Sequence, residues 1–150
     1  MKIVIQRVSK ASVTISQHKV AEIQGGLLIL LGIVNEDTQE DIKWLVRKIV
    51  NLRIFNDVND VMNKSLIDID GNAIVVSQFT LHASTKKGSR PSYMKAAKPD
   101  VAISLYQQFI ASLETALNKK VQTGEFGADM KVELLNDGPV TIIMDSKVKE

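Results

Sequence analysis

The chain has 150 residues, of which 45% are hydrophobic and 24% are charged, so its composition favours one globular domain with a substantial core. It contains no cysteine, which excludes disulfides, thiolate metal sites and a cysteine nucleophile. The formal net charge is only +2, yet the charged residues between Gly71 and Pro99 are all basic.

The first third of the chain predicts strands joined by short turns. Strands are expected at residues 2–6, 11–16, 20–23 and 27–34, the last of them buried on both faces. Lys2 and Arg7 interrupt the first apolar stretch, so a secretory signal is not expected. The longest apolar run, at 27–34, is too short to span a bilayer. We therefore expect a cytoplasmic protein with no membrane partner.

Two helices are predicted from caps and apolar periodicity. Thr38 followed by Asp41 is typical of a helix N-cap, and the second helix opens at Pro99 and Asp100. Apolar residues at helical spacing follow each start: Ile42, Leu45, Val46, Ile49, Val50 and Leu52 in the first helix, and Val101, Leu105, Phe109, Leu113 and Leu117 in the second. Each helix therefore carries one apolar face.

The remaining segments predict loops and hairpins. Loops are expected at 56–64, 82–99 and 121–129, and strands at 65–69, 73–81, 130–135 and 140–145. Asp70-Gly71 gives a hairpin signal between the first two of these strands, and Asn136-Asp137-Gly138 suits a turn between the last two. Strands do not alternate regularly with helices, which argues against a doubly wound parallel sheet. We predict one α/β (α+β-like) domain over residues 1–150, with mixed and antiparallel strands in a barrel-like sheet and two main helices.

The stretch SQFTL, residues 77–81, ends the predicted strand 73–81. Strand periodicity places Ser77 and Phe79 on one face and Gln78 and Thr80 on the other. A hydroxyl and an amide at a strand end are able to line a pocket, although composition alone favours a strand that simply leaves the core. His82 shares the predicted face of Thr80, but one histidine beside a threonine is weak support for a nucleophile and its base.

Three further side chains leave structural and functional interpretations open. Phe126 and Met130, near Gly124 and Gly127, are typical either of a core anchor or of an apolar, base-stacking pocket. Arg7 in its apolar strand suits an ion pair or an orienting hydrogen-bond donor. Two isolated histidines without cysteine do not make a zinc set, and no phosphate-binding glycine motif occurs. We therefore expect no metal and no cofactor.

The basic loop KKGSRPSYMKAAK carries Lys86, Lys87, Arg90, Lys95 and Lys98, with Tyr93 among them. Such cation density suits phosphate binding, and it equally suits a solvated loop. Pro139 in NDGPVT is unusual for another reason. Proline cannot donate a hydrogen bond to the strand it introduces, and the bond that precedes it has access to the cis form.

The motifs SQFTL, RPSY, TGEFGADM and NDGPVT occur in this order, after MKIVIQRVSKASVTI and GGLLILLGI. Together they resemble the bacterial-type D-aminoacyl-tRNA deacylases over nearly the whole chain. This resemblance implies hydrolysis of the ester between a D-amino acid and the terminal adenosine of tRNA, and removal of glycine wrongly attached to alanine tRNA. It implies homodimers with active sites at the subunit interface and a role for the terminal 2′-hydroxyl of the tRNA. We expect no DNA partner.

The resemblance also implies roles for individual residues. Ser77, Gln78 and Thr80 line the catalytic pocket. Beyond the resemblance, we count Phe79 among the catalytic residues, we expect Thr80 to position substrate, and our hypothesis is that main-chain N–H groups near Phe79 and Thr80 bind the oxyanion. Gly138-Pro139 of the other subunit enters that pocket with a cis peptide bond, and Arg7 helps to hold it. Phe126 and Met130 pack around the terminal adenine. From the loop itself we expect Lys86, Lys87, Arg90 and Lys95 to bind RNA.

Two other functions fit parts of this pattern. A non-enzymatic module would bind tRNA through the basic loop 86–98 and leave the ester intact. A threonine esterase would use Thr80 on small molecules.

Overall fold

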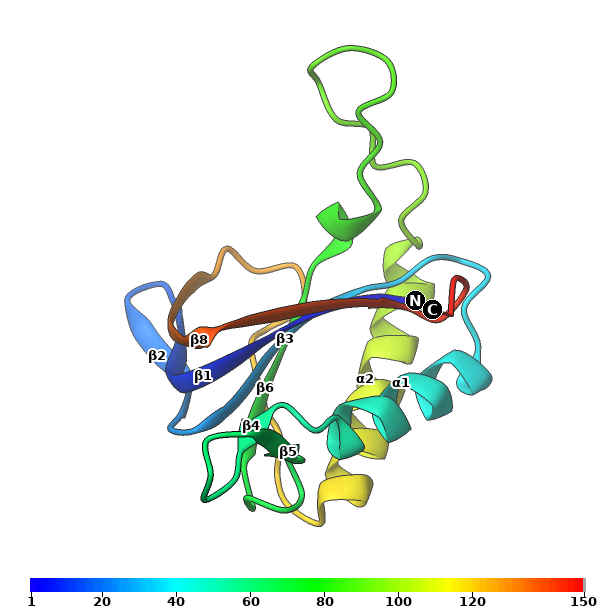
Figure 1. Cartoon of the computed structure of the whole chain (residues 1–150). Coiled ribbons are helices and arrows are strands. Elements are labelled where there is room, and N and C mark those ends of the chain that lie inside the picture. Colours follow the sequence, from blue (N-terminus) through cyan, green and yellow to red (C-terminus); the bar gives the residue numbers. More distant parts are fainter. Residues whose placement is uncertain (150) are drawn as a thin grey trace.

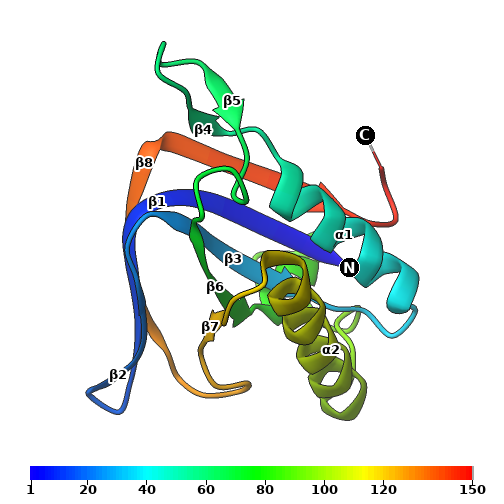
Figure 2. The same cartoon turned by 90° about the horizontal axis from the view of Figure 1, so that it is seen from below.

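A single long strand organises the sheet. The computed structural model describes residues 1–149, in which Lys2–Ile15 forms β1. Predicted strands at 2–6 and 11–16 are therefore one strand, because β8 (Lys131–Asp145) pairs with β1 along nearly its whole length. On its other edge β1 pairs with β3 (Gly26–Gly32) through Lys2–Val8 and with β2 (His18–Ile23) beyond its bend. Figures 1 and 2 show β1 and β8 bending together.

The sheet mixes parallel and antiparallel pairs. Its order is β2-β1-β3-β6-β7, with β8 added on β1. The strand β6 (Asn72–Ser77) pairs in parallel with β3 and with β7 (Gln122–Thr123). The predicted hairpin around Asp70-Gly71 is therefore wrong, since residues 66–70 form turns that return the chain to lie parallel to β3. The predicted loop 56–64 is also partly wrong, because it holds the small antiparallel pair of β4 (Phe55–Asn56) and β5 (Met62–Lys64).

Two helices cover one face of this sheet, as predicted. Helix α1 (Gln39–Asn51) begins at a capping box in which Thr38 and Asp41 exchange hydrogen bonds, and α2 (Pro99–Leu117) begins at its proline and ends at Asn118 in the left-handed conformation. The two helices lie side by side beneath the sheet (Figure 2). Their apolar faces bury the main core, which includes Phe109, Leu45 and Ile29. A fully buried Leu or Phe contributes about 1.5–3 kcal/mol to stability, so this layer fixes the sheet to the helices.

A second, smaller core fills the opposite face of the central strands. Val8, Val13, Leu28, Ile74 and Val76 are all buried there. Because the far halves of β1 and β8 bend over this face, the sheet curls into a barrel-like shape, which confirms the predicted architecture. Within residues 1–149 there is no helix long and apolar enough to cross a membrane.

Candidate functional site

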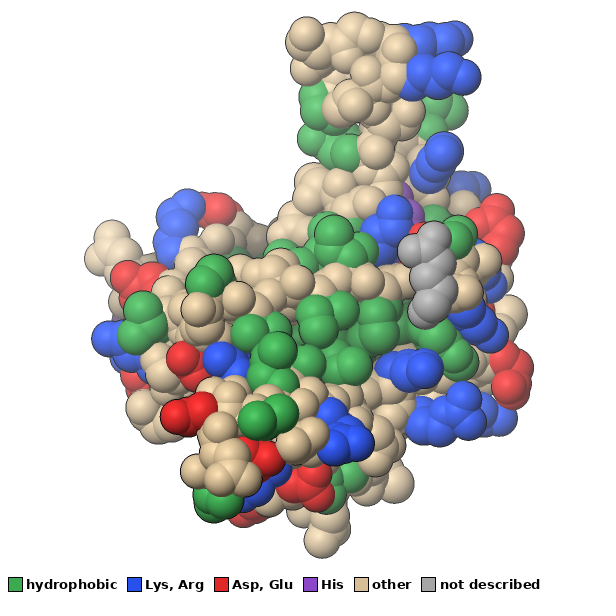
Figure 3. Space-filling model, viewed as in Figure 1, with side chains coloured by type: hydrophobic (Ala, Val, Ile, Leu, Met, Phe, Trp, Pro, Cys, Tyr) green, Lys and Arg blue, Asp and Glu red, His purple; other side chains and the backbone are tan. Residues whose placement is uncertain are grey.

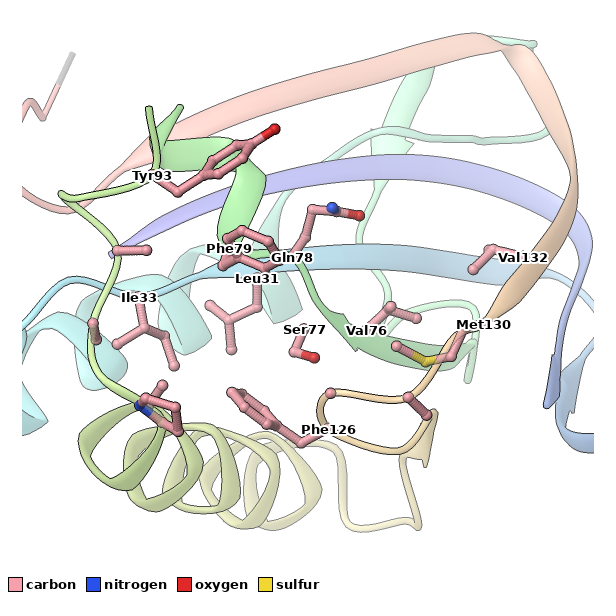
Figure 4. A pocket seen from close by; sticks show the side chains of 16 residues that line it. Leu31, Ile33, Val76, Ser77, Gln78, Phe79, Tyr93, Phe126, Met130 and Val132 are labelled. Atoms are coloured by element: carbon pink, nitrogen blue, oxygen red, sulfur yellow. The ribbon is translucent and has the colours of Figure 1, made fainter. Parts of the chain in front are cut away.

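A pocket opens where β6, the start of α2 and the loop before β8 meet. It encloses about 490 Å³ (Figure 4). Its polar side is the chain segment Ser77-Gln78-Phe79, and its apolar side includes Phe126, Met130 and Leu31. A cavity of this size and polarity is typical of a small-molecule site rather than of a packing defect.

The chain turns abruptly at the polar side of the pocket. Strand β6 ends at Ser77, and Phe79–His82 forms a 3-10 helix, η1. The predicted strand 73–81 is therefore too long, and the alternation of faces assigned to Phe79 and Thr80 is wrong. Gln78 N–H still donates to Leu31 O of β3 at 2.8 Å, so the turn starts from a fixed point.

The change of geometry at η1 leaves two main-chain donors near the pocket. The first bond of η1 runs from Leu81 N–H to Gln78 O at 3.2 Å. The N–H groups of Phe79 and Thr80 precede that bond, where a helix leaves its first donors without internal partners. Phe79 is 55% exposed and lines the pocket, so one of these two donors belongs to a pocket-lining residue.

Thr80 sits just outside the pocket. Its Oγ1 lies 2.5 Å from Gln78 Nε2, which donates to it, and this bond holds the pocket-lining amide in place. His82 takes no part in that contact. Its Nε2 is buried without a hydrogen-bond partner among residues 1–149, and a Cβ on Gly32 would approach its ring to 3.0 Å. The geometry therefore gives no nucleophile–base pair between Thr80 and His82.

Phe126 and Met130 both line the pocket and both pack into the fold. The ring of Phe126 meets Tyr106 edge to face, with centroids 5.7 Å apart. Tyr106 in turn donates to Val75 O of β6 at 3.0 Å, and burial raises the pKa of its hydroxyl to about 12. Phe126 is therefore anchored in the core and also lines the pocket (Figure 4), while the stacking of a base on its ring stays a prediction.

Arg7 holds a break in the pairing of β1 with β8. Val8 pairs with Asn136 and Gln6 with Thr141, so the four residues Asp137 to Val140 stand opposite Arg7 alone. The predicted turn and the predicted strands 130–135 and 140–145 are therefore one strand with a wide bulge, which we call the β8 bulge (residues 137–140). Hairpin chemistry misled the sequence analysis here because β1 continues to pair on both sides of the bulge.

The β8 bulge is rigidly attached although its tip is exposed. Arg7 is 7% exposed, and its Nε donates to Asp137 O at 2.9 Å while Nη1 donates to Ile54 O at 2.7 Å. Asn136 Nδ2 adds bonds to Arg7 O at 3.1 Å and to Val140 O at 3.0 Å. The Gly138–Pro139 peptide bond is cis, and both residues are exposed. Neither of them, nor Arg7, lines the pocket of its own chain.

The basic loop forms a projecting arm, which we call the basic arm (residues 83–98). Ser84 and Ser92 exchange two main-chain hydrogen bonds of 2.8 and 2.9 Å at its base. The arm stands clear of the domain in Figure 1. Its cations Lys86, Lys87, Arg90 and Lys95 are all exposed, and none of them forms a salt bridge with a described carboxylate.

Comparison with known proteins then decides the family. The family model described as D-Tyr-tRNA(Tyr) deacylase matches residues 4–145. The chain belongs to this family. It is 67% identical to a D-aminoacyl-tRNA deacylase of Flavobacterium johnsoniae and 70% identical to one of Flavobacterium psychrophilum, in each case over 100% of both chains.

The chain is also similar in sequence and fold to a protein of solved structure. The structure, titled c-Myc DNA unwinding element binding protein, is 40% identical, superposes with a TM-score of 0.92, and aligns over 97% of this chain and 98% of its own.

One wall of the pocket in this family member consists of residues that were not predicted from sequence as site residues. Tyr93, Ala96, Ala97 and Pro99 form a wall that comes from the return of the basic arm into α2. Ala97 N–H donates to Ile33 O at 2.8 Å, which ties this return to the end of β3. The only signal in the sequence was Tyr93 within a basic loop, and that pattern does not say where the chain re-enters the domain. In the described residues no group of three His, Asp or Glu side chains is placed to hold a metal ion.

Proposed function

We propose that the protein is a hydrolase that cleaves the ester between a D-amino acid and the terminal adenosine of tRNA. Family membership supports the reaction class, and the observation that carries the proposal is the two-sided pocket. Its apolar side, with Phe126 and Met130, suits a flat aromatic base. Its polar side at Ser77, Gln78 and Phe79 suits the aminoacyl ester.

The chemistry is acyl transfer to water. Water adds to the ester carbonyl carbon, the carbonyl oxygen becomes an oxyanion, and collapse releases the ribose 3′-oxygen, which takes up a proton. The N–H groups of Phe79 and Thr80 are the proposed oxyanion donors, because preorganised main-chain donors stabilise that charge where it develops. Thr80 holds Gln78 rather than attacking the ester, and the terminal 2′-hydroxyl of the tRNA assists the water.

Selection of the D enantiomer is proposed to come from a second copy of the chain. The tip of the β8 bulge is exposed and fixed by Arg7, and it does not reach the pocket of its own chain. Placed in the pocket of a partner, Gly138 and Pro139 would form a main-chain wall beside the substrate α-carbon. An L side chain would collide with this wall, whereas a D side chain or a glycine hydrogen would not. The same wall therefore admits glycine attached to alanine tRNA.

The outer face of β8 supports such a homodimer. Leu135 and Ile143 are 55% and 68% exposed, at positions on either side of the β8 bulge. Apolar side chains gather across the middle of the face in Figure 3, where β8 crosses in Figure 1. An apolar surface of this kind on a soluble fold is typical of a protein–protein interface.

Deacylation of D-tyrosyl-tRNA compared with L-tyrosyl-tRNA tests the proposal. We expect release of D-tyrosine and retention of the L ester. A non-enzymatic RNA-binding module, using Lys86, Lys87, Arg90 and Lys95, would retain tRNA and leave both esters intact. A threonine esterase would hydrolyse small activated esters and would lose all activity in Thr80→Ala. Equal hydrolysis of both enantiomers would refute the role of Gly138 and Pro139.

A further inference from the structure

The basic arm is joined to the pocket at both of its ends. Its outgoing segment begins directly after His82, the last residue of η1, and η1 also contains Phe79. Its returning strand reaches Tyr93 one residue after the Ser84–Ser92 bridge, and Tyr93 lines the pocket. A displacement of the arm is therefore transmitted to the pocket wall through a two-stranded base and not through a free loop.

The two ends meet in an aromatic pair. Tyr93 and Phe79 pack edge to face, with centroids 5.0 Å apart and an interplanar angle of 76°. Both rings are exposed at the pocket mouth, by 40% and 55%. Figure 4 shows the two rings together above the cavity, with Gln78 beside them. Tyr93 belongs to the arm and Phe79 to η1, so a shift of the arm relative to η1 changes the geometry of the pair.

The charge of the protein is concentrated on this arm. Lys86, Lys87, Arg90, Lys95 and Lys98 give it +5, and it contains no acidic residue. The whole chain carries +2, so the rest of the chain carries −3 by difference. Blue side chains mark the tip of the arm in Figure 3. A polyanion held at the pocket is therefore attracted by the arm and repelled on average by the remainder of the surface.

The reach of the arm fits the polyanion that the proposed function requires. Gly88 at the tip is four residues along the chain from Ser84 at the bridge, which gives about 13 Å for extended chain. That distance spans a few nucleotides of a nucleic-acid backbone upstream of an esterified end in the pocket. A free aminoacyl nucleoside has no phosphate there.

We propose that the basic arm binds backbone phosphates of the substrate RNA and thereby sets the Phe79–Tyr93 pair, so that Tyr93 is a positioning residue for the pocket. This inference rests on the proposed function and adds to it a reason for preferring an RNA ester over a small ester. Phosphate binding orders the arm, the arm fixes Tyr93, and Tyr93 fixes the ring and main chain of Phe79 at the oxyanion site.

The test compares two substrates, four variants and one combination of two of these variants. The substrates are D-tyrosyl-tRNA and D-tyrosyl-adenosine, and the measured quantity is the ratio of their kcat/KM values. Lys86→Gln, Lys87→Gln and Arg90→Gln are combined as the arm variant, and Lys43→Gln, Lys48→Gln and Lys120→Gln are combined as a charge-matched control away from the pocket. Tyr93→Leu removes the ring, and Tyr93→Phe retains it.

We expect the arm variant and Tyr93→Leu each to lower the ratio about tenfold, with the control and Tyr93→Phe near wild type. The arm variant combined with Tyr93→Leu should have nearly the same ratio as either variant alone, because both changes break the same coupling between the arm and the Phe79–Tyr93 pair. Fully multiplicative losses, or equal losses on both substrates, would overturn the coupling. Failure of the wild-type protein to hydrolyse D-tyrosyl-tRNA would instead overturn the proposed function, and the two failures are thus distinguished.

Discussion

Replacement of Arg7 by lysine tests whether the guanidinium holds the β8 bulge. Arg7 donates from two different nitrogens to main-chain oxygens of Ile54 and Asp137, at 2.7 and 2.9 Å. Lysine keeps the charge but has one nitrogen, so at least one of these bonds is lost. A hydrogen bond from a charged donor contributes about 1.5–3 kcal/mol. Since the side chain is 7% exposed, water does not replace the lost bond, and we expect Arg7→Lys to lower the unfolding free energy by about 1.5–3 kcal/mol.

Equilibrium urea unfolding measures this loss, provided that the dependence of the unfolding free energy on urea concentration is the same for both proteins. The rate of D-tyrosyl-tRNA deacylation measures its effect on function. Arg53 provides the matched control, because its guanidinium also donates twice, to Asn63 O at 2.8 Å and to Asn63 Oδ1 at 2.7 Å, but on an exposed side chain. We expect Arg53→Lys to cost less than about 1 kcal/mol. The reasoning would be refuted if the two variants lost equal stability and Arg7→Lys deacylated at the wild-type rate.

Four further outcomes are expected. Thr80→Ala should slow deacylation less than about tenfold, as for the loss of one hydrogen bond, and complete loss in a folded protein would make Thr80 the nucleophile. Gly138→Ala should displace the tip of the β8 bulge, because Gly138 has φ of +129° and an added Cβ would lie 2.9 Å from Nη2 of Arg7. Hydrolysis of L-tyrosyl-tRNA should then rise relative to that of the D ester, and an unchanged ratio of the two rates would contradict this. Burial raises the pKa of Asp41, but hydrogen bonds from Lys147, Ser146 and the Thr38 main chain outweigh it and hold this pKa below its ordinary value. The stability that Asp41 contributes should therefore be complete above about pH 5 and fall at lower pH. Asp41→Asn should flatten that fall in acid unfolding, and an unaltered profile would exclude Asp41 as its source. Neutralising three cations of the basic arm should reduce the slope of log(kcat/KM) against log salt concentration by about 2, because each phosphate contact contributes about 0.7 to that slope. An unchanged slope would exclude phosphate contacts by the arm.

Local signals in the sequence were sufficient for the helices and the fold class. The capping box at Thr38 and the proline at the start of α2 act within one helical turn, so they predict the helix starts correctly. The buried run at 27–34 correctly indicated a central strand, since β3 has neighbours on both edges and cores on both faces.

Long-range pairing accounts for the main errors. Asp70-Gly71 and NDGPVT both carry good hairpin chemistry, but the partner of β6 is β3 and the partner of β8 is β1. Neither partner is adjacent in sequence, and turn residues contain no information on it. The end of β6 at Ser77 also depends on distant residues, because the next acceptor after Leu31 O, Ile33 O, binds Ala97 N–H from the return of the basic arm.

In the candidate site, too, residues in local motifs were predicted and a residue placed by long-range packing was not. Ser77, Gln78, Phe79, Phe126 and Met130 were named from sequence and meet in one pocket. Tyr93 was noted only as an aromatic residue among cations, because its place in the wall depends on how the basic arm returns to the domain.

The β8 bulge also has a consequence for how this protein can vary. Pairing with β1 resumes on both sides of it, at Val8 with Asn136 and at Gln6 with Thr141. One residue added or removed within 137–140 would either reshape the tip that Arg7 holds or slip one flank by a single position, which would exchange the inward and outward side chains of that flank. Insertions and deletions should therefore be selected against in this segment. The tip of the basic arm carries no such register, so a change of length within 85–91, beyond the Ser84–Ser92 bridge, would shift no paired strand.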